Sequence, residues 1–297
     1  MKIVIADQME EEVVRGIASL GTVVERPADL RSALNDADVL IVRSATAVTR
    51  ELISGAGKLR LVARAGVGLD NVDQQACAEK GIKVLNTPGA STNAVAELAI
   101  GLMIGSYRNI QKAHHQMKGG RWEKKGLLGR EIEGKTLGII GYGRIGAAVA
   151  RKAHALGMSV IAYNPPPRHE DGIAAFVDDL DAFLARADII SLHAALTETT
   201  RDLINRETIA RMKDGAVIIN TARGEMIEED ALYDAVKSGK IAGAAVDVYR
   251  EEPYRGKLVG LDNVFLSPHL GASTKEAQMR IGSELVKILK SELHGQE

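Results

Sequence analysis

Short apolar runs alternate with longer stretches of mixed apolar and polar residues along almost the whole chain. A first block contains β-branched runs at residues 3–5, 22–24, 39–42, 61–63 and 83–85. Short, continuously apolar runs separated by helical stretches are typical of parallel strands that are covered on both faces. A second block continues the alternation, with expected strands at residues 136–140, 159–163, 188–192, 216–220, 244–248 and 263–266. The pattern therefore predicts two parallel-sheet α/β units.

The segments between and after these runs indicate how the blocks are connected. We expect helices over residues 93–109, 178–187 and 228–238, the first of which joins the two blocks. Residues 111–130 are polar and basic, and we expect them to form an extended excursion that contacts a second subunit. A final helix opens with the capping-box sequence Ser273-Thr274-Lys275-Glu276 and runs to about residue 293. A helix in this position can pack back on the first block.

The most informative motif is the sequence G-Y-G-R-I-G at residues 141–146, which follows the expected strand 136–140 and leads into a helical run. A strand, a G-x-G-x-x-G turn and a helix open a dinucleotide-binding βαβ unit. Gly141 permits the tight turn, Gly143 lets the backbone approach a pyrophosphate, and Gly146 lets the helix pack close to the strand. The N–H groups and the positive dipole end of that helix then face the phosphates.

The two blocks and this motif together predict an α/β fold. We expect a Rossmann-type, doubly wound parallel-sheet domain over residues 91–273. It is inserted into a smaller, flavodoxin-like α/β substrate domain made of residues 1–90 and 274–297.

Composition narrows the class of protein. The 297 residues are 45% hydrophobic and 26% charged, and the formal net charge is −1, so no global field favours nucleic acid or acidic membranes. The single cysteine, Cys77, allows no intrachain disulfide. No apolar run approaches the ~18 residues of a membrane span, and the first strand is too short for a signal peptide. No His, Cys or Asp cluster has the spacing of a metal site. We therefore expect a cytoplasmic protein without a metal.

Three polar residues follow strands of the second block. Arg223 follows the strand 216–220, Glu252 comes after the strand 244–248, and His269 follows the strand 263–266. In open α/β sheets, ligands lie beyond the carboxyl ends of the strands, where these side chains can converge. Arg offers a bidentate fork for a carboxylate, His can give and take a proton, and a carboxylate can favour the imidazolium. Each residue also has a purely structural interpretation. His269 could be polar surface, Arg223 could cap a helix, and Glu252 could form a solvated charge pair with Glu251.

The chain resembles the D-isomer-specific 2-hydroxyacid dehydrogenases, and among them the D-3-phosphoglycerate dehydrogenases. The resemblance rests on V-R-S-A-T at residues 42–46, R-A-G-V-G-L-D-N-V-D at residues 64–73 and P-H-L-G-A-S-T-K-E-A at residues 268–277. It implies an NAD-dependent oxidoreductase whose catalytic residues are Arg223, Glu252 and His269. The implied reaction is the oxidation of 3-phospho-D-glycerate to 3-phosphohydroxypyruvate, as in serine biosynthesis.

The resemblance also implies which residues bind the cofactor and the substrate. The implied cofactor-binding residues are Gly141, Gly143, Arg144, Ile145, Gly146, Asn164, His193, Thr221, Ala222 and Asp247. The implied substrate-binding residues are Arg43 for the distal phosphate, Ser44 beside it, and Gly66, Val67 and Gly68 for the carboxylate. Lys124, or alternatively Lys125, is implied to reach the site of a neighbouring subunit. The implied partners are therefore a small-molecule 2-hydroxy or 2-oxo acid and a second copy of the chain, as a homodimer or a dimer of dimers.

The sequence departs from the family pattern after the strand 159–163. An acidic residue is expected there to bind the adenosine ribose, and this chain has Asn164. Because Asn164 does not repel a 2′-phosphate, and Arg168 and His169 could bind one, NADP is an alternative cofactor. The regulatory domain of longer relatives is expected to be absent.

Other substrates and one other function stay open. A related enzyme acting on glyoxylate, hydroxypyruvate or a sulfonated hydroxy acid fits the same residues, although Arg43 favours an anionic distal group. A nicotinamide-sensing corepressor on the same fold is a minor alternative, since fold alone does not fix function.

Overall fold

The computed structural model describes residues 1–165 and 171–294, so Arg168 and His169 lie outside the described residues. The chain forms two compact units. Unit 1 comprises Met1–Thr92 and Ala272–Glu297, and unit 2 comprises Asn93–Gly271. These divisions fall within two residues of the expected ones at residues 90 and 273. Unit 2 is thus an insertion into unit 1.

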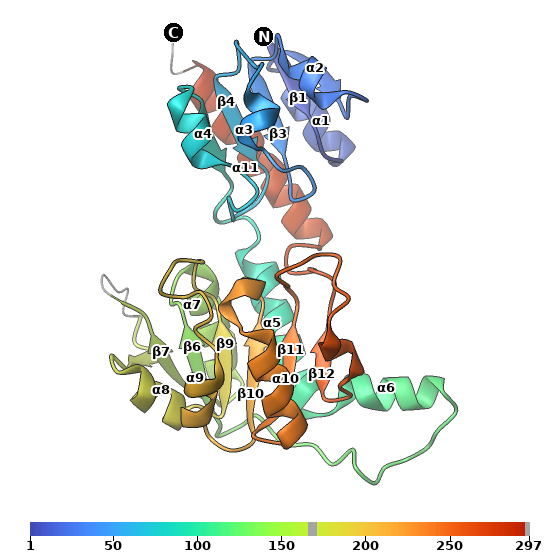
Figure 1. Ribbon diagram of the computed structural model, residues 1–297, viewed down its shortest axis with the longest axis vertical. Coiled ribbons are helices and arrows are strands. Elements are labelled where there is room, and N and C mark those ends of the chain that lie inside the picture. Colours follow the sequence, from blue (N-terminus) through green and yellow to red (C-terminus); the bar gives the residue numbers. More distant parts are fainter. Residues whose placement is uncertain (166–170, 295–297) are drawn as a thin grey trace. The chain divides into compact units, whose positions relative to one another are not determined.

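Unit 1 is built on a parallel sheet (Figure 1). Its described strands, in spatial order, are β2 (Thr22–Glu25), β1 (Lys2–Ile5), β3 (Val39–Val42), β4 (Leu61–Arg64) and β5 (Lys83–Asn86). The order 2-1-3-4-5 is that of flavodoxin-like folds. Its helices are α1 (Glu11–Ala18), α2 (Leu30–Leu34), α3 (Arg50–Ile53), α4 (Gln74–Glu79) and α11 (Lys275–His294).

Helix α11 belongs to unit 1 although it lies at the far end of the sequence. It packs on α1 through small residues, because a Cβ at Gly282 would lie 2.0 Å from Val13 Cγ2 and one at Gly16 would lie 3.1 Å from Val286 Cγ2. Ile281, Leu285 and Leu289 are buried with Ile3, Ile5 and Ile17 in one cluster. This helix therefore completes the core of the first sheet.

Unit 2 contains a longer parallel sheet with helices on both faces (Figure 1). Its described strands, in spatial order, are β12 (Val264–Leu266), β11 (Ile241–Val246), β10 (Ala216–Asn220), β9 (Ile189–Leu192), β6 (Thr136–Ile140), β7 (Ser159–Tyr163) and β8 (Ala174–Phe176). Its helices are α5 (Thr92–Tyr107), α6 (Ile110–Lys118), α7 (Arg144–Ala155), α8 (Leu180–Arg186), α9 (Arg206–Arg211) and α10 (Glu229–Ser238), with the short 3₁₀ helices η1 (Gly224–Met226) and η2 (Lys257–Gly260). The chain order reverses between β6 and β9, which is the switch point of a Rossmann-type sheet.

The predicted fold class is confirmed, and two details of the prediction are wrong. Strand β8 was not expected, because its three residues Ala174–Phe176 are only partly buried and give no apolar run. Residues 111–130 were expected to be extended, but their first part lies in α6. Helix α6 buries only Gln116 on its surface, so the sequence lacks the apolar stripe that usually marks a helix.

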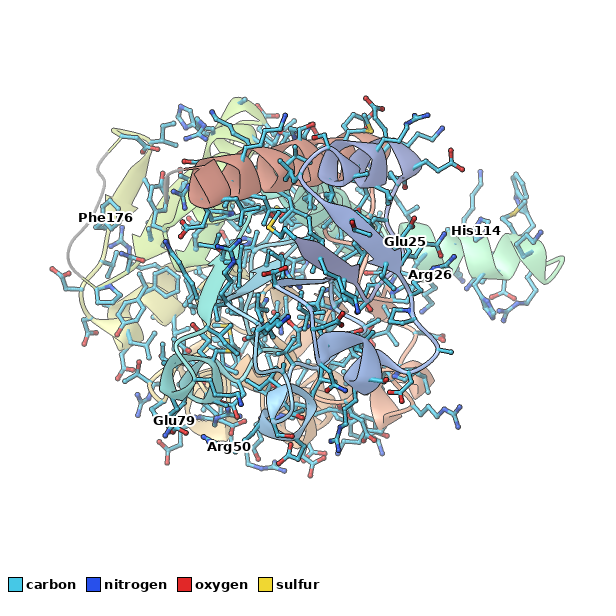
Figure 2. The ribbon with its side chains drawn as sticks, turned by 90° about the horizontal axis from the view of Figure 1, so that it is seen from above. Glu25, Arg26, Arg50, Glu79, His114 and Phe176 are labelled. Carbon is cyan, nitrogen blue, oxygen red and sulfur yellow. The ribbon has the colours of Figure 1, made fainter. Side chains whose placement is uncertain are left out.

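Residues 108–129 form a closed appendage of unit 2, which we call the arm. The arm starts and ends at one point, because Arg130 N–H donates to the Tyr107 carbonyl at 2.8 Å. Helix α6 extends away from the sheet of unit 2, and His114 is labelled on it in Figure 2. The exposed fraction is 75% for Trp122 and 94% for Leu128, which is high for large apolar side chains.

No helix within residues 1–165 and 171–294 is long and apolar enough to span a bilayer. No group of three or more His, Cys, Asp or Glu side chains there could hold a metal ion.

Candidate active site

The glycine motif forms the turn between β6 and α7, at the switch point of the unit 2 sheet. Gly141 has a φ of +90°, and a Cβ there would lie 2.4 Å from Ala194 N, which follows β9. A Cβ at Gly146 would lie 2.2 Å from the Gly141 carbonyl oxygen, whereas a Cβ at Gly143 would meet nothing within 4 Å. Two glycines therefore allow close packing, and the third faces open space at the start of α7.

This part of unit 2 fits a dinucleotide. Helix α7 begins at Arg144, and its N-cap residue Gly143 provides no side-chain acceptor for the first N–H groups. Thr221 Oγ1 and His193 Nδ1 are buried atoms with no partner in the described residues. They follow the paired strand ends Leu192 and Asn220. Because buried polar atoms are normally hydrogen-bonded, these two atoms and the helix N-terminus suit polar groups of a bound ligand.

His193 is held as a neutral imidazole. Its Nε2 lies 2.8 Å from Ser191 Oγ. Part of the residue is exposed, but burial of the ring lowers the pKa of His193 to about 3. A neutral ring can offer Nδ1 as a donor or an acceptor, according to its tautomer.

Asn164 supports the glycine turn from the end of β7. Its Oδ1 accepts the Tyr142 N–H at 2.9 Å. The Tyr142 ring packs edge-on against Phe176 in β8, and its hydroxyl lies 2.9 Å and 3.0 Å from the two carboxylate oxygens of Asp171. The pKa of Asp171 is lowered, because the Ile173 N–H, the Tyr142 hydroxyl and Arg151 outweigh the effect of burial. The sequence analysis did not anticipate the roles of Tyr142 and Asp171.

His269 and Glu252 form an ion pair at the carboxyl edge of the same sheet. His269 Nδ1 lies 2.9 Å from Glu252 Oε2 and 3.1 Å from Oε1. An ionised carboxylate only accepts hydrogen bonds, so Nδ1 carries the proton of this contact. Glu252 Oε1 is itself fixed by the Tyr249 N–H at 3.1 Å. Because no hydrogen bond to His269 Nε2 is found in the described residues, Nε2 can exchange a proton with a ligand.

Asp247 fixes the loop that carries His269. Its Oδ1 accepts the Ser267 hydroxyl at 2.6 Å and the Leu270 N–H at 2.7 Å, and its Oδ2 accepts the Gly271 N–H at 2.9 Å. Burial raises the pKa of the Asp247 carboxyl, and these three donors oppose the rise. The loop needs this support because His269 has a φ of +53°, which is uncommon outside glycine.

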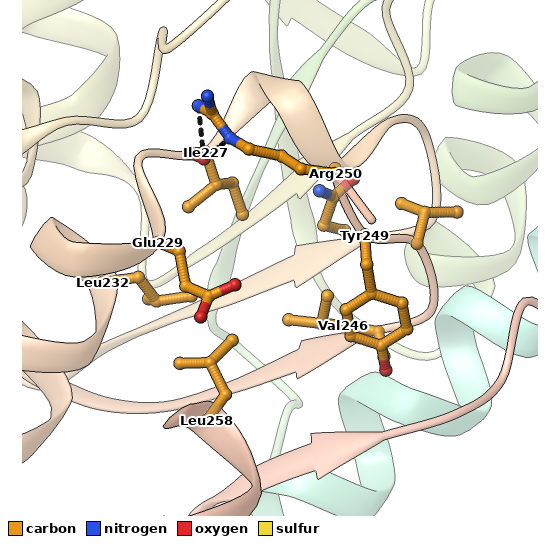
Figure 3. Close-up of a pocket in the computed structure, with 10 residues that line it drawn as sticks. Ile227, Glu229, Leu232, Val246, Tyr249, Arg250 and Leu258 are labelled. Carbon is orange, nitrogen blue, oxygen red and sulfur yellow. Dashed lines mark hydrogen bonds between the residues drawn. The ribbon is translucent and has the colours of Figure 1, made fainter. Parts of the chain in front are cut away.

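The loop that carries Arg223 lies against the loop that carries Glu252. A Cβ at Gly224 would lie 2.1 Å from the Tyr249 carbonyl carbon and 2.3 Å from Arg250 N. Arg250 then binds the Ile227 carbonyl through Nη2 at 3.0 Å, as Figure 3 shows. The structure therefore brings Arg223, Glu252 and His269 onto neighbouring, mutually supported loops.

A small cavity lies beneath this junction (Figure 3). Apolar side chains of Leu232, Val246 and Leu258 line it, together with the carboxylate of Glu229. None of the expected catalytic residues Arg223, Glu252 and His269 lines this cavity. We therefore do not assign it to the substrate.

The expected substrate residues of unit 1 lie on two loops. Asp7 and Asn71 shape the loop of Arg43 and Ser44. Asp7 Oδ2 accepts the Arg43 N–H at 2.6 Å, and Asn71 Nδ2 donates to the Arg43 carbonyl at 2.8 Å. Arg43 Nη1 donates to the Gln8 carbonyl at 2.9 Å and Nη2 to Gln278 Oε1 at 2.6 Å. The guanidinium thus has neutral partners and forms no ion pair with any carboxylate among the described residues.

The second loop offers backbone donors. The carbonyls of Gly66 and Val67 accept hydrogen bonds from the Thr87 N–H at 3.0 Å and from Asn86 Nδ2 at 2.6 Å. The N–H groups of Gly66, Val67 and Gly68 have no acceptor in the described part of the chain. A Cβ at Gly66 would lie 2.0 Å from Arg64 Nη1, so this guanidinium covers the loop. Unpaired N–H groups beside a cation suit a carboxylate, and Arg64 was missed as a candidate.

The remaining expected residues have simpler surroundings. Ala222 is buried, and its N–H binds Asn220 Oδ1 at 3.0 Å. Ile145 is half-buried, whereas Arg144 and Ser44 are exposed. Lys124 is exposed on the arm, with Nζ 6.0 Å from the centre of the Trp122 ring.

Comparison with known proteins identifies similar chains. Residues 100–271 match the family model described as D-isomer specific 2-hydroxyacid dehydrogenase, NAD binding domain. A hydroxypyruvate reductase of Thermotoga maritima is 54% identical over 89% of this chain and 88% of its own length. A D-3-phosphoglycerate dehydrogenase of Methanocaldococcus jannaschii is 46% identical over 100% of this chain, which spans 58% of that protein.

A solved structure shows the same arrangement of elements. The D-lactate dehydrogenase of Aquifex aeolicus, complexed with NAD and lactic acid, superposes with a TM-score of 0.87 at 29% identity. The match covers 99% of this chain and 96% of that one.

Proposed function

Since the chain belongs to the D-isomer-specific 2-hydroxyacid dehydrogenases, a family of NAD-dependent oxidoreductases, we propose that 3-phospho-D-glycerate is the hydroxy acid that it oxidises. The product is 3-phosphohydroxypyruvate. The observation that supports the dehydrogenase chemistry of this chain is the His269–Glu252 pair, which leaves Nε2 of a charged or neutral imidazole available to a ligand.

His269, Glu252 and Arg223 act on different parts of the reaction. When bound, the nicotinamide supplies or accepts the hydride at the substrate C2 atom. In the reductive direction His269 Nε2 donates its proton to the developing alkoxide, and in the oxidative direction it removes the hydroxyl proton. Glu252 keeps the ring oriented through Nδ1. Arg223 binds the substrate carboxylate and the carbonyl oxygen, which accumulates charge in the transition state.

Arg43 supports a substrate with an anionic distal group. Its guanidinium is oriented by Gln8 and Gln278 without being neutralised by them, so its charge is available to a phosphate. The unpaired N–H groups of residues 66–68 are assigned to the carboxylate of the same substrate.

A substrate panel tests the proposal. Initial rates with NADH are compared for 3-phosphohydroxypyruvate, 3-sulfopyruvate, hydroxypyruvate and glyoxylate. We expect the highest kcat/KM with the phosphorylated acid, and Arg43→Met should lower that value while leaving glyoxylate reduction unchanged. A wild-type enzyme that prefers hydroxypyruvate or glyoxylate would contradict the phosphate assignment.

Hydroxypyruvate reduction is the second candidate. It is favoured by the 54% identity to the Thermotoga maritima hydroxypyruvate reductase, which this chain matches over 88% of that protein. The two candidates differ only in the distal group, so the same panel separates them.

We propose NAD as the working cofactor, with weak discrimination against NADP. Asn164 carries no charge to repel a 2′-phosphate, and its Oδ1 is used by Tyr142. Asn164→Asp should therefore lower kcat/KM with NADPH more than with NADH. An NADH preference of several thousandfold in the unmodified enzyme would show that Asn164 does not relax selectivity.

We propose a homodimer in which the arm of one copy contacts the other. The exposed Trp122, Leu128 and Met117 side chains on the arm support this assignment. Lys124 on the same arm is the residue offered to the partner's substrate. Sedimentation of the wild type and of Trp122→Glu tests the idea, with a dimer expected for the first and a monomer for the second. A wild-type monomer at micromolar concentration would contradict it.

A further inference from the structure

Asn220 ends strand β10 and is completely buried, although it is polar. Its Oδ1 accepts the Ala222 N–H at 3.0 Å, and its Nδ2 donates to the Arg223 carbonyl at 2.8 Å. One carboxamide therefore serves both an N–H and a carbonyl of the loop that begins directly after the strand. The backbone partners also fix which end of the amide is oxygen and which is nitrogen.

The strand that carries Asn220 is firmly held in the sheet. β10 pairs with β9 on one side and with β11 on the other, and Asn220 is in register with Leu192 and Val246. Its carbonyl accepts the Asp247 N–H at 2.9 Å. Asn220 thus connects the Arg223 loop to the strand end from which Asp247 holds the loop of His269.

Arg223 is restrained from both sides of its backbone. Asn220 holds its carbonyl, and the next residue, Gly224, packs directly on the peptide between Tyr249 and Arg250. That peptide leads to Glu252, which accepts the Tyr249 N–H. Loss of the Asn220 contact would free one side of the restraint and let the Arg223 backbone shift relative to the His269–Glu252 pair.

We propose that Asn220 is a positioning residue that acts through Arg223 and sets where this guanidinium meets the carboxylate of the 2-oxo acid. The inference rests on the proposed role of Arg223. Only a side chain with a donor and an acceptor at this reach satisfies both loop groups, so neither a carboxylate nor an alkyl group can replace it. A displacement of about 1 Å at a reacting centre can cost on the order of 10²-fold in rate.

Asn220→Asp is the sharpest variant, because it keeps the size of the side chain and puts a second carboxyl oxygen in place of the NH₂ group that donates to the Arg223 carbonyl. Asn263→Asp is the matched control. Asn263 also uses Nδ2 to bind a backbone carbonyl of unit 2, that of Ala242 at 2.8 Å, but it lies before β12. We expect Asn220→Asp to raise KM for the 2-oxo acid and to lower kcat/KM by about 10²-fold, with the control near wild type.

Two further readouts separate positioning from a general loss of structure. The dissociation constant of NADH, measured by fluorescence titration, should be unchanged in Asn220→Asp. The double variant Asn220→Asp with Arg223→Lys should be little worse than Arg223→Lys alone, since residues that act as a unit are not additive.

The inference is overturned if Asn220→Asp behaves like Asn263→Asp, if NADH affinity falls in parallel with kcat/KM, or if the two losses multiply in the double variant. If Asn220→Asp does not fold, Asn220→Ser is judged by the same three criteria. Failure of the proposed function is a separate outcome, because it is seen in the wild type as an absence of 2-oxo acid reduction.

Discussion

Gly143 and Gly146 belong to one motif, but a side chain would have different effects at the two positions. A Cβ at Gly143 would meet no atom within 4 Å, and the residue has φ −85° and ψ −162°, which alanine can adopt. A Cβ at Gly146 would lie 2.2 Å from the Gly141 carbonyl oxygen. We therefore expect Gly143→Ala to affect ligand binding and Gly146→Ala to affect folding as well.

The magnitudes follow from these contacts. Gly143→Ala should change the free energy of unfolding by less than about 1 kcal/mol, because alanine is a weaker N-cap than glycine by roughly 1 kcal/mol and the lower entropy of the unfolded chain returns about 0.4–1 kcal/mol. Gly146→Ala gains up to about 1 kcal/mol of helix propensity. It must also move the Gly141 backbone, and such overpacking costs about 1–3 kcal/mol, so a net destabilisation is expected.

Urea unfolding and NADH fluorescence titration measure the two effects separately. We expect Gly143→Ala to unfold like the wild type but to bind NADH at least about 10-fold more weakly, which corresponds to about 1.4 kcal/mol, because its methyl group occupies the space through which a pyrophosphate approaches. Gly260→Ala is the control, since a Cβ there also meets nothing within 4 Å and the residue lies far along the chain. If folded Gly143→Ala binds NADH as tightly as this control, the reasoning about the turn is refuted.

Three more predictions concern the pair, the buried histidine and the loop contact. His269→Ala should lower kcat by about 10²–10⁴-fold while NADH affinity stays constant, and stopped-flow reduction without this loss would refute its role as the proton donor. His193 has its pKa lowered by burial from 6.5 to about 3, so the unfolded chain binds the extra proton between these values and stability falls as pH drops through this window. The loss is at most about 1.4 kcal/mol per pH unit, the limit for one linked proton, and partial exposure of the residue makes it smaller. Urea unfolding of His193→Asn at pH 7 and 5 should show a smaller decrease than the wild type. Gly224→Ala places a methyl 2.1 Å from the Tyr249 carbonyl carbon, so it should raise KM for the 2-oxo acid and lower stability by about 1–3 kcal/mol, and an unchanged KM would show that the two loops are independent.

The sequence predicted those elements whose buried positions form a recognisable run or repeat of apolar residues. Strands such as β10 (Ala216–Asn220), which is buried at every position, read as continuous apolar runs. Strand β8 and helix α6 show no such run or repeat, because β8 is three partly exposed residues and α6 projects from the sheet. Strand β8 is defined by its pairing with β7, for which the sequence gives no local signal.

The candidate site also contains residues that the sequence could predict and residues that it could not. Arg223, Glu252 and His269 could be proposed from residue type and from their positions after strands. The duties of Asn220, Tyr142 and Asp171 could not, because each is a hydrogen bond to a group whose position only the folded loops define. The contact of Arg43 with Gln278 joins residues 235 positions apart and has no local signal.

The hydrogen bond between Arg130 N–H and the Tyr107 carbonyl closes the arm at its base, so the arm can vary independently of the sheet. Because the chain leaves and rejoins unit 2 at one point, residues 108–129 can lengthen, shorten or change sequence without altering the register of any strand. Replacing 22 residues by about four would even recover ~1.5 kcal/mol of loop-closure entropy, at ~0.6 kcal/mol for each halving of length. Evolution and protein engineering can therefore vary the length and sequence of the arm while the nucleotide-binding sheet stays the same.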